Sequence, residues 1–374
     1  MRNALKVLLL LLLVATVSSC SSSKKLVLRI EEKPKPTQAP LAPPVKVRYV
    51  ADVGDVGYKA VLFARNGRLY IGNLDGRIYA VDPIKGSKKL VARLKKPIEA
   101  GVLVTQKTLY AATTGGVLYK LSLKNGKVLA KRQLAFPVME RIYMHGARLY
   151  VITEDDTVTC MDPKTLKVLW SYSNGLPGTM DIRSTAGLLF LPDGICTGFS
   201  DGSVAKISYK GDLLFSVQVG KGSMFIDSDA TPKGSNRIFV TSVNGYTQAI
   251  SAKDGSLVWR REISSYSNLQ ENIFGLFLAD ETGDVMALDN DNGETIWKKK
   301  LTLKGNIFAI KLVGNFLYAI TQDGTLVVLD ALKGKIMDIK HNIDSDFSSH
   351  ILLYNNRLYL ISRDGDIYEI SSKQ

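Results

Sequence analysis

One unit recurs along the chain at a spacing of about 40 residues, and Ile238–Trp259 is its clearest copy. This copy reads as an apolar strand, a turn at Asn244-Gly245, a second strand, a turn at Asp254-Gly255 and a third strand that ends on Trp. The first-turn position recurs at Gly76, Gly116, Asp156, Gly202, Gly245, Gly283, Gly324 and Gly365, with gaps of 40, 40, 46, 43, 38, 41 and 41 residues. A period of ~40–45 residues with hairpin turns is typical of the four-stranded blade of a β-propeller.

Three columns of mostly apolar residues keep a fixed distance from the first-turn position. They are Tyr70, Tyr110, Tyr150, Cys196, Phe239, Phe277, Tyr318 and Tyr359, six residues before it; Ile78, Leu118, Val158, Val204, Thr247, Val285, Leu326 and Ile367, two residues after it; and Val81, Leu121, Met161, Ile207, Ile250, Leu288, Leu329 and Ile370, five residues after it. Short segments with period-two alternation and many Val, Ile, Tyr and Phe residues are typical of strands. Asn-Gly and Asp-Gly at the turns supply the positive φ that tight hairpins need.

The eight copies predict an all-β fold, an eight-bladed β-propeller with PQQ-like or WD40-like four-stranded blades over residues 46–374. The copies leave no room for helices between them, which excludes a βαβ fold. Because open sheet edges are a liability, we expect the blades to close into a ring. The last copy stops at Gln374, just after its third strand. We therefore expect Lys46–Val50, which precedes the first copy, to supply the missing outermost strand.

Residues 1–19 have the features of an export signal. A positively charged start is followed by the apolar run Val7–Val14, which is too short to span a membrane. Val17-Ser18-Ser19 directly before Cys20 resembles the cleavage site of a bacterial lipoprotein, in which the cysteine is lipidated and becomes the mature N-terminus. The alternative is an ordinary cleaved signal with an incidental cysteine. Ser21 stands where an inner-membrane retention signal would have Asp, so the same resemblance favours the outer membrane.

Residues 20–45 are rich in Ser, Lys, Glu and Pro, with prolines at positions 34, 36, 40, 43 and 44. This composition predicts a semi-extended tether that does not fold by itself. We expect it to hold the propeller away from the lipid surface.

The chain has a formal net charge of +14 at pH 7. Its lysines are spread over hairpin turns, at Lys85, Lys88, Lys89, Lys124, Lys127, Lys164, Lys167, Lys333 and Lys335. Nucleic-acid binding would need a basic stripe with aromatic residues, and export argues against it as well. The lysines form either a solvated rim or a surface weakly attracted to anionic lipid, an attraction that salt would screen.

Two cysteines remain after Cys20. An exported protein can form disulfides, but Cys196 occupies the aromatic column and Cys160 lies in a column shared with Ala80, Ala249, Ala287 and Val328. We interpret both as small buried apolar residues, with a disulfide between them as the alternative.

No catalytic or metal-binding pattern emerges from the sequence. The three histidines, His145, His341 and His350, lack metal-ligand spacing, and the common hydrolase, metalloprotease, P-loop and redox motifs are missing. Asp289–Gly293 superficially resembles the start of a calcium loop, but Lys300 stands where the loop's final Glu is required. We assign this segment to the second turn of its unit and expect no metal and no cofactor.

A pattern of Asp, Gly and Trp at four-residue spacing is complete at Asp289, Gly293 and Trp297, and the units that end on Trp170 and Trp259 keep the Trp. It resembles the repeat of quinoprotein dehydrogenases, in which Trp side chains lock neighbouring blades together. That repeat is shared by enzymes and non-enzymes, so it does not by itself imply an activity.

A lipidated eight-bladed propeller with such repeats resembles the BamB family, lipoproteins of the outer-membrane β-barrel assembly machinery. Two stretches carry the resemblance further: Met180–Ser184, against the family's apolar-x-apolar-Arg segment, and Asp227–Pro232, close to its Asp-x-Asp-Thr-Thr-Pro. In that family these two loops connect blades, lie on one face and bind the periplasmic POTRA domains of BamA. The resemblance implies a contact set of Met180, Ile182, Arg183, Asp227 and Asp229. Met180 departs from the family's usual Leu, and Asp181 and Ser184 are not typical of it.

An exposed Arg beside two apolar residues is a common hot-spot composition, and the two Asp residues could orient it or meet a basic partner group. The alternative is that Arg183 only pairs with Asp227 or Asp229 and holds the two loops together. The resemblance thus implies a non-enzymatic scaffold, anchored in the outer membrane on its periplasmic face, that docks on BamA and assists the folding and insertion of outer-membrane proteins. The alternatives are a periplasmic quinoprotein-type enzyme and a propeller lipoprotein that binds another envelope partner.

Overall fold

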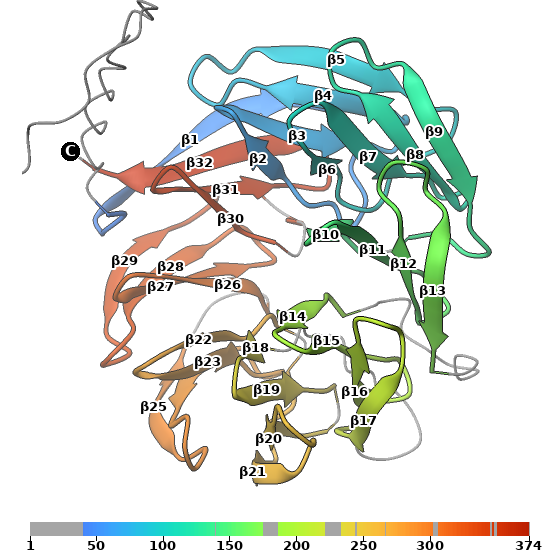
Figure 1. Cartoon of the computed structure of the whole chain (residues 1–374). Coiled ribbons are helices and arrows are strands. Elements are labelled where there is room, and N and C mark those ends of the chain that lie inside the picture. The colour runs from blue at the N-terminus through green and yellow to red at the C-terminus, as the bar shows by residue number, and fades with distance from the viewer. Residues whose placement is uncertain are drawn as a thin grey trace, which may run out of the picture. The chain divides into compact units, whose positions relative to one another are not determined.

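The computed structural model describes residues 40–138, 140–174, 186–220, 233–243, 245–265, 267–301, 306–344, 346–347 and 350–373. These residues contain 32 strands in eight four-stranded antiparallel sheets, arranged as blades around a central axis (Figure 1). The predicted all-β, eight-bladed propeller is confirmed. Within the described ranges the chain forms no helix that is long and apolar enough to cross a membrane.

The first half of the ring contains blades 1 to 4, each ordered from the innermost to the outermost strand. Blade 1 consists of β2 (Phe63–Arg65), β3 (Arg68–Gly72), β4 (Arg77–Val81) and β5 (Lys88–Arg93). Blade 2 consists of β6 (Leu103–Val104), β7 (Thr108–Ala112), β8 (Val117–Ser122) and β9 (Val128–Gln133). Blade 3 consists of β10 (Tyr143–His145), β11 (Arg148–Ile152), β12 (Thr157–Met161) and β13 (Val168–Ser173). Blade 4 consists of β14 (Leu189–Leu191), β15 (Gly194–Gly198), β16 (Ser203–Ser208) and β17 (Leu213–Gln218).

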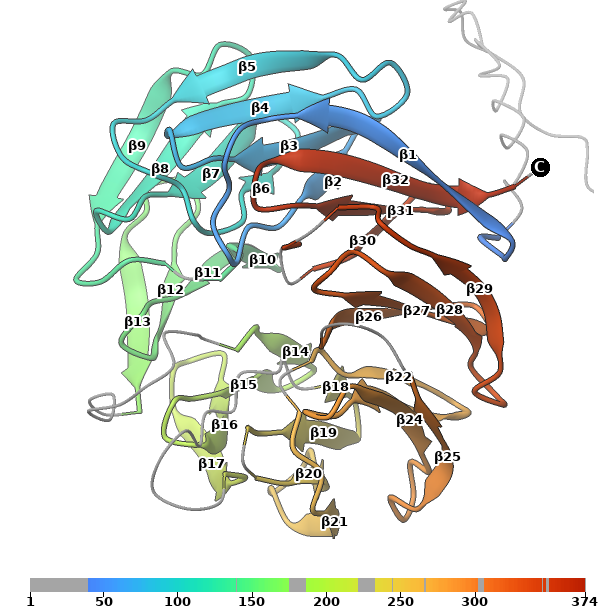
Figure 2. The same ribbon diagram turned by 180° about the vertical axis from the view of Figure 1, so that it is seen from behind.

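The second half contains blades 5 to 8. Blade 5 consists of β18 (Lys233–Gly234), β19 (Arg237–Thr241), β20 (Thr247–Ser251) and β21 (Leu257–Arg261). Blade 6 consists of β22 (Gln270–Asn272), β23 (Gly275–Ala279), β24 (Asp284–Leu288) and β25 (Thr295–Lys300). Blade 7 consists of β26 (Ile307–Val313), β27 (Phe316–Thr321), β28 (Leu326–Asp330) and β29 (Ile336–Lys340). Blade 8 consists of β30 (Leu352–Tyr354), β31 (Arg357–Ile361), β32 (Asp366–Ser372) and β1 (Val45–Asp52), which comes from the start of the chain (Figure 2).

The three sequence columns form the core between the blades. Every residue of the three columns is buried, and each lies on one of the two middle strands of its blade. Each middle strand packs one row of side chains against the preceding blade and the other against the following blade. Side chains that alternate along a middle strand point to opposite faces of its sheet. Both faces are buried, because each sheet is covered by a neighbouring blade on either side.

The first turn of each blade follows the prediction at seven of the eight positions, where φ is positive. Gly245 is the exception: its φ is not in the left-handed region. A Cβ there would lie 2.9 Å from the Val219 carbonyl oxygen, and Gly245 forms a bridge with Gly220 of the preceding connection. Glycine is needed at this turn because another segment of backbone approaches it closely, and not for positive φ.

The tryptophans join neighbouring blades, as the repeat implies. The indole Nε1 atoms of Trp170, Trp259 and Trp297 donate to the carbonyl oxygens of Tyr209, Asn290 and Ala331, each in a turn of the next blade, at 2.9–3.0 Å. Each ring also covers a turn glycine with positive φ: Gly211, Gly293 and Gly334, respectively. Between blades 4 and 5 the ring of Phe215 covers Gly255 in the same way.

The closing strand is β1, as predicted from Lys46–Val50. It pairs antiparallel with β32, from Val45 opposite Ser372 to Asp52 opposite Asp366. Blade 8 is thus built from the two ends of the propeller. A further hydrogen bond joins the closing strand to blade 7: the Val45 amide donates to the Asp338 carboxylate at 2.7 Å.

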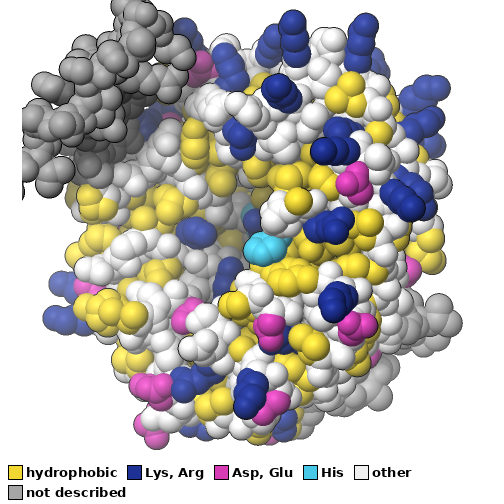
Figure 3. All heavy atoms as spheres, in the orientation of Figure 1, with side chains coloured by type: hydrophobic (Ala, Val, Ile, Leu, Met, Phe, Trp, Pro, Cys, Tyr) yellow, Lys and Arg dark blue, Asp and Glu magenta, His cyan; other side chains and the backbone are white. Residues whose placement is uncertain are grey.

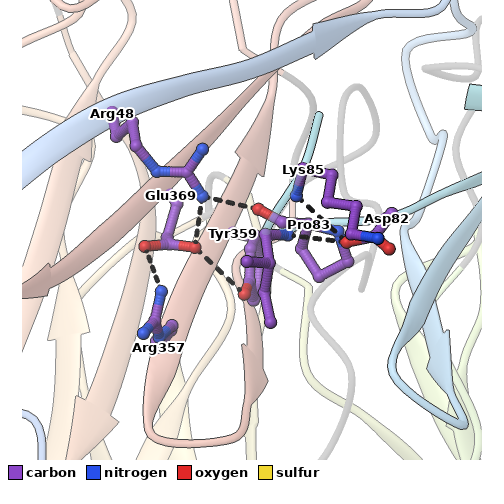
Figure 4. Close-up of polar contacts among 8 residues, drawn as sticks. Arg48, Asp82, Pro83, Lys85, Arg357, Tyr359 and Glu369 are labelled. Atoms are coloured by element: carbon purple, nitrogen blue, oxygen red, sulfur yellow. Dashed lines mark hydrogen bonds and ion pairs between the residues drawn. The ribbon is translucent and has the colours of Figure 1, made fainter. Parts of the chain in front are cut away.

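A buried carboxylate fastens the closing strand (Figure 4). Glu369 of β32, 2% exposed, accepts from Arg48 of β1 at 2.8 Å and from Arg357 of β31 at 2.6 Å. The Tyr359 hydroxyl lies 3.3 Å from the same carboxylate. Arg48 also donates to the carbonyl oxygen of Pro83, in the turn between β4 and β5 of blade 1. One ion-pair network therefore joins three strands of blade 8 to blade 1.

Cys160 and Cys196 are both free and buried, which confirms their interpretation as small apolar residues. Burial raises the pKa of the Cys196 thiol to about 12, so the group stays protonated.

Replacing Gly293 by Ala tests the contribution of the tryptophan contact to stability. An added Cβ would lie 2.5 Å from Trp259 Cε3, and φ is +73°. Gly283→Ala is the matched control, because φ there is +83° and no atom lies within 4 Å of the added Cβ. In urea unfolding we expect Gly283→Ala to lower the free energy of unfolding by about 1 kcal/mol, because an alanine disfavours the left-handed backbone conformation. Gly293→Ala should lower it by about 1–3 kcal/mol more, because the added Cβ also meets the Trp259 ring. Equal costs would mean that the ring does not constrain this turn.

Replacing Glu369 by Ala tests the lock on the closing strand. The change removes two charge-assisted hydrogen bonds, while Arg48 and Arg357 can still reach water because each is more than one-third exposed. We expect the free energy of unfolding to fall by about 2 kcal/mol. Glu294→Ala, on an exposed turn, should change it by no more than about 0.5 kcal/mol. A Glu369 variant as stable as the wild type would contradict the role given to this network.

Candidate functional site

The predicted partner-binding residues lie outside the residues that the structure describes. Met180, Ile182 and Arg183 fall within positions 175–185, and Asp227 and Asp229 fall within positions 221–232. The predicted lipidation site, Cys20, also falls outside the described ranges. These assignments therefore stay predictions.

The described ends of the two segments have a defined place in the topology. One segment joins β13 of blade 3 to β14 of blade 4, and the other joins β17 of blade 4 to β18 of blade 5. Both run from the outermost strand of one blade to the innermost strand of the next. All blades have the same strand order. The two connections therefore leave and re-enter the sheets on the same face of the propeller, and they are one blade apart.

Hydrogen bonds hold two of these ends to the following blade. Asn174, the last residue before the first segment, donates through Nδ2 to Asp201 Oδ2 at 2.7 Å and to Ser203 Oγ at 2.9 Å, both in blade 4. Gly220, the last before the second segment, forms its bridge with Gly245 of blade 5. Rigid strands thus fix where both segments leave the propeller.

A cavity of about 440 Å³ lies on the propeller axis, next to the returning ends of the same segments. All eight blades contribute to its wall through the innermost strands or the residues just before them. Its lining is Val61, Leu62, Phe63, Ala64, Val102, Arg141, Ile142, Tyr143, Leu188, Lys233, Asn268, Gln270, Lys311, His350, Ile351, Leu352, Leu353 and Tyr354. Figure 3 shows the centre of the ring hollowed, with Lys, Arg and His side chains around the opening.

A charged cluster around the buried Glu140 forms part of the cavity wall. Glu140 is 2% exposed, with its carboxylate 3.8 Å from Arg141 Nε and 3.9 Å from His350 Nε2. The Tyr143 hydroxyl donates to Glu140 at 3.4 Å and accepts from the Leu188 amide at 3.1 Å. Residues of blades 3, 4 and 8 therefore meet in one polar network on the axis.

The surroundings shift the pKa of both titrating members of this cluster. Burial would raise the pKa of Glu140, but contact with His350 and the charges of Arg141 and Lys59 outweigh it, so the pKa lies below its ordinary value. Burial, and next the charge of Arg141, lowers the pKa of His350 to about 3, while Glu140 opposes the shift. At neutral pH the cluster therefore contains a carboxylate, a guanidinium and a neutral imidazole.

The sequence reasoning missed this cavity because its charged residues come from separate blades. A signal did exist: Arg141 and His350 each precede the first-turn residue of their blade, Asp156 and Gly365, by fifteen positions. The same distance also gives Val61 and Asn268, so this column identifies a lining residue in four blades, whereas Lys233 and Lys311 lie at other distances from their turns.

Within the residues described, no group of three or more His, Cys, Asp or Glu side chains could hold a metal ion. Asp289, at the start of the segment that resembles a calcium loop, accepts through Oδ1 from the amides of Asp291 and Asn292 at 2.8 and 3.0 Å. The carbonyl of Asn290 is the acceptor for Trp259. The segment is a turn that receives the tryptophan of the preceding blade.

Comparison with known proteins identifies the family. The family model described as outer membrane protein assembly factor BamB matches residues 74–299 and 281–374, well over half of the chain. The chain belongs to the BamB family.

Individual BamB relatives are distant in sequence but similar over most of their length. The outer membrane protein assembly factor BamB of Shewanella oneidensis is 23% identical over 337 residues, 84% of this chain and 85% of that protein. The BamB of Yersinia pestis is 20% identical over 78% of this chain and 76% of that protein.

Solved structures agree on the fold. The crystal structure of BamB from Moraxella catarrhalis has a TM-score of 0.76 at 20% identity, over 87% of this chain and all of that one. Quinohemoprotein alcohol dehydrogenase from Comamonas testosteroni has a TM-score of 0.68 at 11% identity, over 88% of this chain and 77% of that one. At these identities the likeness shows the propeller alone, which BamB shares with enzymes.

The neutral state of His350 in the folded protein predicts a pH-dependent stability. Because the folded pKa is about 3 and the ordinary value is 6.5, the unfolded chain binds the proton first as pH falls, and stability is lost below pH 6.5. Glu140, Arg141, Lys59 and Lys233 are the charged groups that face the imidazole. Between pH 7 and pH 5 we expect His350 to remove about 2 kcal/mol from the free energy of unfolding.

Urea unfolding at both pH values measures this effect. His350→Gln should lose that share of the pH dependence, whereas His341→Gln, at an exposed position, should keep it. An unchanged pH dependence in His350→Gln would contradict the prediction, because it would show that the imidazole takes up protons equally in the folded and the unfolded protein.

Proposed function

We propose that this protein is a lipid-anchored, non-enzymatic scaffold subunit of the machinery that assembles β-barrel proteins into the outer membrane. The observation that carries the proposal is the match of the BamB family over residues 74–374, together with the propeller fold. The related proteins from Shewanella oneidensis and Yersinia pestis are named as outer membrane protein assembly factors and not as enzymes. A role as assembly factor follows for this chain from its membership of the family.

The anchor is assigned to Cys20, after removal of residues 1–19. Each lipid CH₂ buried in a bilayer contributes ~0.8 kcal/mol, so the acyl chains carried by one lipidated cysteine hold the protein firmly at the membrane. The predicted tether, residues 20–45, ends earlier than expected, because Leu41 is already buried in the core between blades 7 and 8 and the first strand begins at Val45. Residues 20–40 then act as the tether between the periplasmic face of the outer membrane and the propeller. Because the tether leads directly into the closing strand, the anchor is attached to blade 8.

The docking surface is assigned to the connections between blades 3 and 4 and between blades 4 and 5, with Met180, Ile182, Arg183, Asp227 and Asp229 as the contact residues. The topology supports this choice, since the described ends of both connections open on one face, one blade apart. The partner is BamA, bound through its POTRA domains. Arg183 with its apolar neighbours supplies a typical hot spot, and the two carboxylates either orient it or meet a basic group of the partner.

The contribution of the propeller is then positional. A ring of eight blades, closed and cross-braced, fixes the described ends of the two connections and so holds the docking surface on one face of the propeller. Unfolded outer-membrane proteins are the substrates of the assembled complex, and this subunit assists their folding and insertion through BamA.

Reversal of the Arg183 charge tests the docking surface. Full-length wild type, Arg183→Glu and the control Arg93→Glu, an exposed change on β5 of blade 1, are used to capture BamA from detergent-solubilised envelopes. Loss of a hot spot of at least about 2 kcal/mol should reduce capture by Arg183→Glu more than tenfold, while Arg93→Glu captures as the wild type does. Circular dichroism checks that both variants are folded.

The possible outcomes distinguish a test of the assembly role from a test of the assigned docking residues. Equal capture by all three proteins would leave the assembly role standing and refute the assigned docking residues. Failure of the wild type to capture BamA would refute the proposed role itself.

A further inference from the structure

The axial cavity carries more positive than negative charge. Arg141, Lys233 and Lys311 contribute to its lining from blades 3, 5 and 7, whereas Glu140, the carboxylate beside Arg141, is almost fully buried. In the part of the chain that the structure describes, no carboxylate lies within ion-pair distance of the Lys233 or Lys311 ammonium group. Three cations thus converge on one enclosed space with a single buried counter-charge.

The Arg141 side chain still has donors available. Its Nε is buried, has no hydrogen-bond partner among the described residues and lies 3.8 Å from Glu140, beyond hydrogen-bond range. The guanidinium lies over the Tyr143 ring, with Cζ 5.7 Å from the ring centroid, and 41% of the side-chain surface is accessible. A planar guanidinium held in this way is suited to bidentate contact with a carboxylate or phosphate.

The two amides in the wall are already engaged. Asn268 donates to the Ile310 carbonyl at 3.0 Å and accepts from the Ile310 amide at 3.2 Å. Gln270 donates to Leu269 at 2.9 Å and accepts from the Leu312 amide at 3.3 Å. These side chains join β22 to β26, which leaves the three cations as the main groups that can recognise a polar ligand.

Apart from Tyr143, His350 and Tyr354, the rest of the wall is apolar, with Val61, Phe63, Val102, Ile142 and Leu188 among its residues. A concave, mostly apolar space with a few convergent polar groups is typical of small-molecule sites, and its 440 Å³ falls within their usual range of about 300–1,000 Å³. Since the wall is formed by strands of a closed ring, its shape does not depend on the ligand.

We propose that the axial cavity binds a small organic anion, in which a carboxylate or phosphate meets Arg141, Lys233 and Lys311 and an apolar body contacts the surrounding side chains. The cavity volume of about 440 Å³ favours a small free molecule over a lipid headgroup, because the acyl chains of a lipid would have to remain outside the cavity. The three cations of this site differ from the assigned docking residues, so the proposal goes beyond the proposed function.

The electrostatics of the cavity lining agree with this proposal. Burial, and next the charge of Arg141, lowers the pKa of Lys311. Burial and the charges of Lys311 and Arg141 lower the pKa of Lys233, with Glu271 opposing the shift. A bound anion would offset this mutual repulsion, so binding should be accompanied by a rise in the pKa of both lysines.

Calorimetric titration of the full-length protein in detergent at low salt tests the proposal. The probes are phenyl phosphate and benzoate, with phenol as the uncharged analogue. We expect saturable binding at one site for at least one anion, weakening with added salt, and none for phenol at the same concentrations. Lys311→Gln and Lys233→Gln should each weaken binding by about tenfold or more, and the control Lys85→Gln, on an exposed turn of blade 1, should bind as the wild type does.

Three results would overturn the proposal: no saturable binding of either anion up to about 1 mM, binding of phenol as tight as that of the anions, or unchanged affinity in both lysine variants. Two separate lysine variants are used so that a folding defect in one, detected by circular dichroism, leaves the other informative. BamA capture by the same variants provides the independent readout: if Lys311→Gln loses the anion but still captures BamA, the anion site and the assembly role are distinct.

Discussion

The backbone hydrogen bonds between β1 and β32 are the interaction on which the rest of the structure depends. A blade of a propeller contacts only its two neighbours, so an open ring would leave blade 8 without its outermost strand and expose the edge of β32. Pairing the first strand with the last completes that sheet, and Arg48 extends the closure to blade 1 through Pro83. The axial cavity follows from closure, because only a complete ring brings residues of blades 3, 5, 7 and 8 around one axis.

The contacts between neighbouring blades differ around the ring. Blades 3, 5 and 6 each place a tryptophan on a turn glycine of the next blade, and blade 4 uses Phe215 for the same contact. A large ring that covers backbone buries much surface, and its N–H donor bonds a turn carbonyl that would otherwise face solvent. Blade 1 lacks such a ring; there the backbone carbonyl of Val91 lies directly against Gly126 of blade 2. Repeats of similar sequence therefore produce interfaces of different composition.

Much of the fold could be predicted from the sequence because it depends on local pattern. Period-two alternation and turn residues identified the strands, the eight copies identified the blades, and the missing final strand identified Lys46–Val50 as the closing segment. Features set by tertiary contacts could not be found in this way. Lys206 looks like an ordinary solvent-exposed lysine, yet it is 1% exposed and bonds Asp193 of its own blade and the Ala252 carbonyl of the next. Gly245 looks like a left-handed turn residue, yet close approach of Val219 explains it. The axial cluster was missed because Glu140, Lys311 and His350 become neighbours only when the ring is closed.

The pairing of β1 with β32 also constrains the order in which the protein can fold. Ala42 and Ser372, which are bonded just before the closing strand begins, are 330 positions apart in the chain. A chain that is exported with its N-terminus first presents β1 long before its partner strand has arrived, and contacts between such distant segments form slowly. During that interval the first strand is an unpaired edge near the membrane to which we assign its anchor. Loss of residues 366–374, which contain all of β32, would leave this edge unpaired permanently, although almost the whole sequence would still be present.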